Sequence, residues 1–126
     1  MARHHHSPGF LALVQDAKTR VQEISIEEFR RRSCAGEQLA LVDVREDHEW
    51  EAGHLPGAVH LSRGVLERDV EARFPDPETP LVLQCGGGFR SALAADNLRR
   101  MGYTNVYSLA GGYRDWVEAG LPIERA

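Results

Sequence analysis

The sequence contains very little cysteine. Only two of its 126 residues are cysteines, Cys34 and Cys85, and their spacing fits neither a disulfide framework nor a cysteine-rich metal site. It also has no apolar run close to the ~20 residues that a membrane-spanning helix needs, and its first residues lack the long apolar core of a secretory signal. We therefore expect a cytoplasmic protein, in a reducing environment that keeps thiols free.

An excess of positive charge is absent as well. Fifteen Lys and Arg residues stand against nineteen Asp and Glu residues, which gives a net charge of −4 at pH 7. This balance argues against a nucleic acid or an anionic membrane as a partner. The run His4–His6 is a weak metal motif, either native or left from an expression tag, and we assign it no function.

The length and composition suit one domain. With 126 residues and 42% hydrophobic content, the chain can bury a core of its own. We expect residues 23–126 to form the domain and residues 1–22 to form an N-terminal extension with a short amphipathic helix, which Ser7 and Pro8 would start. The apolar stripe of that helix is predicted to consist of Phe10, Val14, Ala17 and Val21. Packing on the domain is the expected role of the helix, and contact with a partner is the alternative.

Beyond this extension, short apolar runs alternate with helical patterns. Strands are predicted at 39–44, 58–61, 81–84 and 105–109, and helices after Ser25, at 46–51, 64–74 and 92–101, and after Gly111. Ser25 and Glu28 suit a capping box, and Ile24 and Phe29 suit a hydrophobic staple. Because buried parallel strands are apolar throughout, we predict an α/β fold, with a mostly parallel sheet of about five strands and helices on both faces.

One short segment concentrates the reactive chemistry. Cys85 follows the strand at 81–84 and precedes the helix at 92–101, where open α/β sheets bind ligands. A helix N-terminus and the nearby Arg90 favour the thiolate, which is the nucleophilic form of cysteine. The residues expected to surround an anion at the sulfur are Gly86, Gly87, Gly88, Phe89, Arg90 and Ser91. Since glycines readily adopt positive φ and let successive N–H groups point inward, the sequence predicts a reactive cysteine in an anion-binding loop.

This segment also has a less specific interpretation. A cysteine after a strand is often only a small buried hydrophobic residue, and three glycines alone make a flexible turn. The combination of a preceding strand, a following helix and Arg90 within the loop favours the reactive cysteine.

Three motifs occur in order along the chain. They are Asp43–Glu46 with Glu49-Trp50 and Gly53–Ala58, then Cys85, Gly88, Arg90 and Ser91, then Leu109–Trp116 with Gly120–Pro122. Together these motifs resemble the rhodanese family, and the similarity runs from about Glu23 to Ile123. Residues 23–126 are therefore identified as a rhodanese domain, similar to the single-domain members of that family.

The resemblance implies a sulfurtransferase that works through a persulfide on Cys85. The Cys85 thiolate would take sulfane sulfur from thiosulfate or another donor and pass it to cyanide, glutathione or a protein thiol. Backbone N–H groups from Gly86 to Ser91 would stabilise the anionic sulfur. The resemblance implies no metal and no organic cofactor, and a sulfur-relay protein is a further candidate partner.

The resemblance also suggests roles for residues outside the loop. Asp43 and Arg45 are expected to support the site as a structural ion pair, with substrate contact by Arg45 as the alternative. His54 and His60 are expected to bond backbone groups. Cys34 is expected at a helix end as a bystander, with a role as resolving thiol as the alternative.

Two other function classes remain as alternatives. A non-catalytic rhodanese-like binding module is the first, although such modules usually lack the loop cysteine. A cysteine phosphatase or arsenate-reductase-like enzyme is the second, although those loops have one residue more between Cys and Arg than the four found here.

The composition of the loop suggests a preference among sulfur donors. Related loops often carry polar or basic residues where this chain has Gly86, Gly87 and Phe89, so Arg90 is the one charged residue in the loop. We expect weak steering of thiosulfate, a raised KM, modest thiosulfate:cyanide activity and a different physiological donor. Phe89 offers an apolar rim that suits a thiol or protein acceptor.

Overall fold

A computed structural model describes residues 6–125, so His4 and His5 lie outside the described residues. Its five strands form one sheet in which every pairing is parallel. The strands are β1 (Gln22–Ile24), β2 (Ala40–Asp43), β3 (Val59–His60), β4 (Leu81–Gln84) and β5 (Val106–Leu109), in the spatial order β1-β5-β4-β2-β3. The predicted α/β fold with a parallel sheet of about five strands is confirmed.

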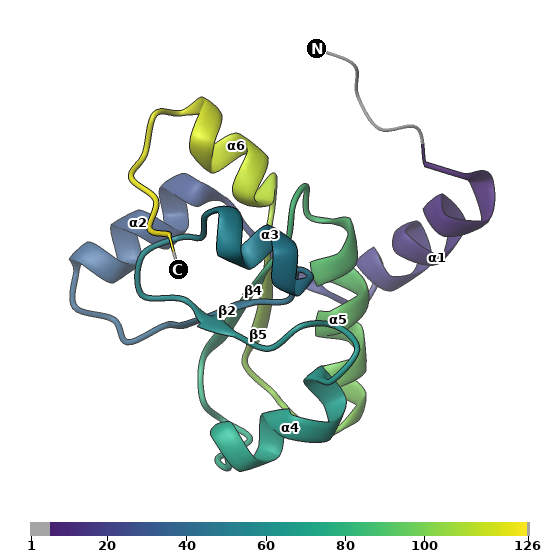
Figure 1. Ribbon diagram of the computed structural model, residues 1–126. Coiled ribbons are helices and arrows are strands. Elements are labelled where there is room, and N and C mark those ends of the chain that lie inside the picture. Colours follow the sequence, from purple (N-terminus) through teal and green to yellow (C-terminus); the bar gives the residue numbers. More distant parts are fainter. Residues whose placement is uncertain (1–5, 126) are drawn as a thin grey trace.

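Helices cover both faces of this sheet (Figure 1). They are α1 (Pro8–Lys18), α2 (Ile26–Cys34), α3 (Asp47–Ala52), α4 (Leu66–Arg73), α5 (Phe89–Arg100) and α6 (Gly112–Glu118). On one face, Leu81 and Leu83 of β4 pack in a cluster with residues of α4 and α5. On the other face, Val82 packs in a cluster with residues of α2 and α6. The apolar β4 therefore lies between two cores, as expected of a central parallel strand.

The sequence does not predict the strand β1, and the first helix that it predicts is longer than the one in the structure. That helix ends at Lys18, and Val21 packs from the following segment against the cluster on the α4 and α5 face. Only Ile24 of β1 is buried, because β1 is a short strand at the edge of the sheet. An edge strand of three residues, two of them polar, leaves no apolar run to detect.

The helix α1 packs along α5, which confirms the predicted packing role (Figure 1). Val14 and Ala17 are each 2% exposed. Just after α1, the guanidinium of Arg20 lies 3.0 Å from the Asp96 carboxylate of α5 and 2.8 Å from that of Asp16. Apolar contacts and a shared arginine thus join the N-terminal segment to the domain.

The start of α2 follows the predicted signals in part. The Ser25 hydroxyl accepts a hydrogen bond from the Glu28 N–H at 3.0 Å, and Ile24 and Phe29 belong to one buried cluster. The second half of the predicted capping box is wrong, because the Glu28 carboxylate binds Arg31. Within residues 6–125, no helix combines the length and the apolar character needed to cross a membrane.

Candidate active site

The loop from Cys85 lies where β4 ends and α5 begins. The helix α5 starts at Phe89, earlier than the predicted residue 92, because Gly88 serves as its N-cap with φ of +93°. A side chain at Gly88 would also meet the Gly111 backbone nitrogen at 3.2 Å. Phe89, Arg90 and Ser91 therefore form the first turn of α5 rather than part of a flexible loop.

The Cys85 sulfur is buried at the base of this turn, with 1% of the residue exposed. It accepts backbone N–H groups from Gly88 at 3.1 Å and from Ser91 at 3.3 Å. Of the N–H groups from Gly86 to Ser91 that the sequence placed around the sulfur, these two point at it. Two backbone donors at the start of α5 thus converge on the sulfur.

A pair of buried hydroxyl groups extends this arrangement. The Ser91 hydroxyl lies 3.5 Å from the Cys85 sulfur and 2.7 Å from the Ser108 hydroxyl of β5. Both serines are fully buried. Ser108 was missed from the sequence, where the only available signal was one polar residue within a predicted buried strand.

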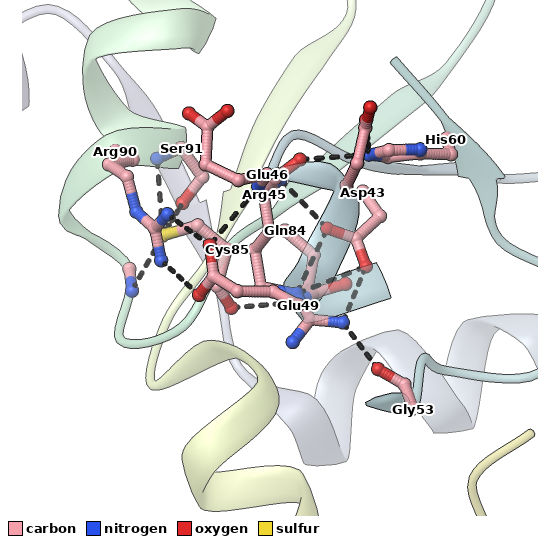
Figure 2. A network of polar contacts seen from close by, with 12 residues as sticks. Asp43, Arg45, Glu46, Glu49, Gly53, His60, Gln84, Cys85, Arg90 and Ser91 are labelled. Atoms are coloured by element: carbon pink, nitrogen blue, oxygen red, sulfur yellow. Dashed lines mark hydrogen bonds and ion pairs between the residues drawn. The ribbon is translucent and has the colours of Figure 1, made fainter. Parts of the chain in front are cut away.

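Arg90 is held by a carboxylate from α3. Its guanidinium donates to both Glu49 oxygens, at 2.8 and 3.1 Å, and Figure 2 shows it beside Cys85 as well as Glu49. The hydrogen bonds from Arg90 lower the pKa of Glu49 to about 2. The Glu49 carboxylate in turn raises the pKa of Arg90. Glu49 was noted in the first motif but given no role, because sequence spacing does not show that α3 faces the loop.

Asp43 and Arg45 form the structural ion pair that the sequence predicted. Arg45 donates to the Asp43 carboxylate at 2.9 and 3.1 Å and to the Gly53 carbonyl at 2.6 Å (Figure 2). The two side chains are 0% and 4% exposed, and the ring of Tyr113 stacks on the Arg45 guanidinium. Burial under Tyr113 argues against the alternative of substrate contact by Arg45.

The start of α6 fixes the backbone of the loop. The N–H groups of Tyr113 and Arg114 donate to the carbonyls of Cys85 and Gly86, at 2.8 and 2.9 Å. A side chain at Gly112 would overlap the Cys85 carbonyl oxygen. The adjacent glycines of the third motif thus allow α6 to approach the loop closely.

Two guanidinium groups flank the glycines of the loop. A Cβ placed on Gly86 would lie 3.0 Å from a terminal nitrogen of Arg90, and one placed on Gly87 would lie 3.4 Å from a terminal nitrogen of Arg114. Arg114 follows the Gly111-Gly112 pair in sequence and was assigned no role there. Arg90 is the one charged residue within the loop, as the sequence shows, and folding places the guanidinium of Arg114 from α6 beside it.

The Phe89 ring lies against part of the N-terminal segment. The Phe89 ring lies 6.2 Å from that of Phe10 and 4.8 Å from that of His6, between ring centroids. The Lys18 ammonium lies 5.1 Å from the centre of the Phe89 ring. Phe89 thus packs against the N-terminal segment, and its role as an apolar rim for an acceptor stays a prediction.

The remaining candidate residues, His54, His60 and Cys34, lie outside the Cys85 loop. His54 bonds the Trp50 carbonyl and His60 bonds the Arg45 carbonyl, as predicted, and both rings stack on the Trp50 ring. Cys34 is exposed at the end of α2. Among residues 6–125, no group of three His, Cys, Asp or Glu side chains is placed to hold a metal ion.

Comparisons with known proteins identify a similar bacterial protein. A candidate sulfur carrier protein of Bacillus subtilis (strain 168), YrkF, is 34% identical over 96 residues, which are 76% of this chain and 51% of that protein. The chain therefore spans about half the length of this curated relative.

Two solved structures are similar over nearly the whole chain. The polysulfide-sulfur transferase homodimer of Wolinella succinogenes is 32% identical, with a TM-score of 0.78, over 94% of this chain and 88% of that one. A Rhodopseudomonas palustris protein of unknown function, described as a possible tyrosine phosphatase, is 29% identical, with a TM-score of 0.79, over 98% of this chain and 100% of that one.

A family model adds the most direct assignment. The model of the rhodanese-like domain matches residues 25–119, a range that contains the Cys85 loop, the Asp43–Arg45 pair and the start of α6. The chain therefore belongs to the rhodanese family.

Proposed function

We propose that this protein is a sulfurtransferase that carries sulfane sulfur as a persulfide on Cys85. The main support is the position of the Cys85 sulfur, which accepts the N–H groups of Gly88 and Ser91 at the start of α5. These donors suit a thiolate before transfer and an anionic persulfide after it. The rhodanese family assignment supports the same chemistry.

The first half-reaction loads sulfur on the enzyme. The Cys85 thiolate attacks the outer sulfur of thiosulfate, and a bond forms between Sγ and that sulfur. The bond from the outer sulfur to the sulfonate sulfur breaks, and its electron pair leaves with sulfite. No proton moves in this step, so the site needs no general base, which agrees with the structural surroundings of His54 and His60.

The second half-reaction returns the thiolate. An acceptor thiolate or cyanide attacks the terminal sulfur of the persulfide, and the electron pair of the broken S–S bond returns to Cys85 Sγ. The product is a new persulfide when the acceptor is a thiol, and thiocyanate when it is cyanide. Division into two displacements is the general advantage of covalent catalysis.

The proposed partners are a small sulfur-donor anion and a thiol or cyanide acceptor. The names of the Bacillus and Wolinella relatives favour polysulfide as a donor and a protein relay as a route for the product. A reducing compartment such as the cytoplasm would keep Cys85 free to react.

A cysteine phosphatase is the second candidate, because one structural relative is described as a possible tyrosine phosphatase. Four residues separate Cys85 from Arg90, a short loop that favours sulfur over tetrahedral phosphate. The test is an assay of thiocyanate formation from thiosulfate or polysulfide with cyanide, beside an assay of aryl phosphate hydrolysis. We expect thiocyanate from the wild type, none from Cys85→Ser, and no hydrolysis. Hydrolysis without thiocyanate would reverse the assignment, and inactivity in both assays would favour a binding module.

A further inference from the structure

The side chain of Arg114 lies against the loop from a different element. The terminal nitrogens and the central carbon of its guanidinium lie 3.4 to 3.6 Å from a Cβ placed on Gly87. Its backbone N–H also bonds the Gly86 carbonyl at 2.9 Å. These are ordinary van der Waals distances, so the guanidinium lies directly beside Gly87. Arg114 is thus fixed to the loop by its backbone and faces it with its charged end.

Other cations near the loop are engaged by carboxylates or carbonyls. Arg90 donates two hydrogen bonds to Glu49. Arg63 donates to the Arg90 carbonyl and lies 3.9 Å from Glu67. Lys18 lies 3.4 Å from Glu23. These contacts reduce the charge that each side chain can offer to a ligand.

Arg114 is engaged less. Within residues 6–125 its guanidinium donates no hydrogen bond, and its nearest carboxylate is Asp115, 3.7 Å from Nε. The Asp115 side chain turns back over Gly111, at the N-cap of α6. Nε therefore faces Asp115, while the terminal nitrogens face the loop, and the side chain remains 43% exposed. A planar pair of free donors at the loop is suited to an oxyanion.

We infer that Arg114 binds the sulfonate end of a thiosulfate-type donor while the sulfane sulfur meets Cys85. This inference rests on the proposed sulfurtransferase function and names a residue that binds one of the candidate donors. The three glycines Gly86-Gly87-Gly88 carry no charge, and Arg114 of α6 supplies a positive charge beside them. Thiosulfate gains both charge and two N–H···O contacts there, whereas a polysulfide gains only the charge.

Binding without turnover provides the first test. In a Cys85→Ser background, which cannot form a persulfide, thiosulfate is titrated while the backbone amide NMR signals of residues 86–91 are followed. We expect saturable binding that Arg114→Gln weakens about tenfold and that Arg99→Gln leaves nearly unchanged. Arg99 is the matched control, since it is 45% exposed and lies at the far end of α5. Equal affinity in the three proteins, or no saturable binding to Cys85→Ser, would overturn the inference.

Turnover with two donors provides the second test. With Cys85 intact, Arg114→Gln should raise the KM for thiosulfate about tenfold with little change in kcat, the pattern of lost ground-state binding. Arg114→Lys should restore part of the loss, and the KM for polysulfide should change less than that for thiosulfate. An unchanged KM for thiosulfate would refute the role of Arg114 and leave the proposed sulfurtransferase function standing. Absence of thiocyanate from the wild type with every donor would refute the proposed function, while the titration would still decide whether Arg114 binds the anion.

Discussion

Ser91 and Ser108 give the Cys85 sulfur a hydrogen-bond partner that can reverse its direction. A thiol can donate to Ser91, which then donates to Ser108. A thiolate or persulfide can instead accept from Ser91, which accepts from Ser108. The 3.5 and 2.7 Å separations permit both directions, so the pair can follow the charge of the sulfur during the proposed transfer cycle.

This pair leads to a prediction for Ser108→Ala. Without Ser108, the Ser91 hydroxyl loses the neighbour that directs its hydrogen toward the anionic sulfur. The bond between the two hydroxyl groups is a neutral hydrogen bond that contributes about 1 kcal/mol, so kcat/KM for sulfur transfer and the rate of Cys85 alkylation should both fall by at most about fivefold. Ser33→Ala, at an exposed residue of α2, is the control. Wild-type rates in the Ser108 variant would show that the pair is only a packing contact.

The ion pair between Glu49 and Arg90 leads to a pH-dependent prediction. The pKa of Glu49 falls from 4.5 to about 2 in the folded protein, so its stabilising effect is fully present above the unfolded value and is lost as the pH falls toward the folded value. Glu49→Gln should reduce the free energy of unfolding at pH 7 by about 1 kcal/mol, because the pair is partly exposed.

Chemical denaturation at a series of pH values measures this effect. The difference between wild type and Glu49→Gln should shrink between about pH 5 and about pH 2. Glu118→Gln, at an exposed residue of α6, should show no such trend. A difference that stays constant over this range would mean that the carboxylate charge of Glu49 does not stabilise the fold.

At the scale of elements, α6 determines the shape of the loop through its close approach. Gly112 has φ of +52°, and any side chain there would overlap the Cys85 carbonyl oxygen. Gly112→Ala should therefore displace α6 or the loop, lower stability by about 3 kcal/mol and reduce sulfur transfer. Gly64→Ala is the control, because a Cβ at Gly64 has no neighbour within 4 Å. Thermal unfolding is the measurement, and equal melting temperatures for both variants would show that α6 has space to spare.

The attachment of α1 to α5 is open to a separate test. Arg20 forms hydrogen bonds with Asp96 of α5 and with Asp16 of α1. Arg20→Gln should speed hydrogen exchange of the α1 amides by about fivefold, the effect of about 1 kcal/mol of local stability, and leave β4 amides unchanged. Arg31→Gln removes a comparable exposed pair with Glu28 and is the control. Unchanged exchange in α1 would show that Val14 and Ala17 hold the helix without the ion pairs.

Elements with strong local signals could be predicted from the sequence. The apolar strand β4 and the Ser25 cap of α2 both depend on neighbours in the chain, and both are present. The start of α5 could not be located, since it depends on the left-handed backbone of Gly88 beside Gly111. The edge strand β1 could not be predicted from the sequence, because its stability comes from pairing with the distant β5.

At the scale of the whole molecule, the site is assembled from elements that are distant in sequence. Cys85, Arg90 and Ser91 lie in one short segment of the chain and could be predicted as a group. Glu49 and Ser108 could not, because their contacts with that group arise only when α3 and β5 are in place. Local motifs thus locate Cys85, the proposed nucleophile, while tertiary contacts decide which charges and hydroxyl groups surround it.

The central claim is that Cys85 carries the transferred sulfur, and the mass of the intact protein tests it most directly. The wild type, Cys85→Ser and Cys34→Ser are each mixed with thiosulfate or polysulfide, weighed, and weighed again after cyanide. We predict a gain of one sulfur, about 32 Da, in the wild type and in Cys34→Ser, its removal by cyanide, and no gain in Cys85→Ser. A gain that persists in Cys85→Ser, or no gain in the wild type with either donor, would contradict the account.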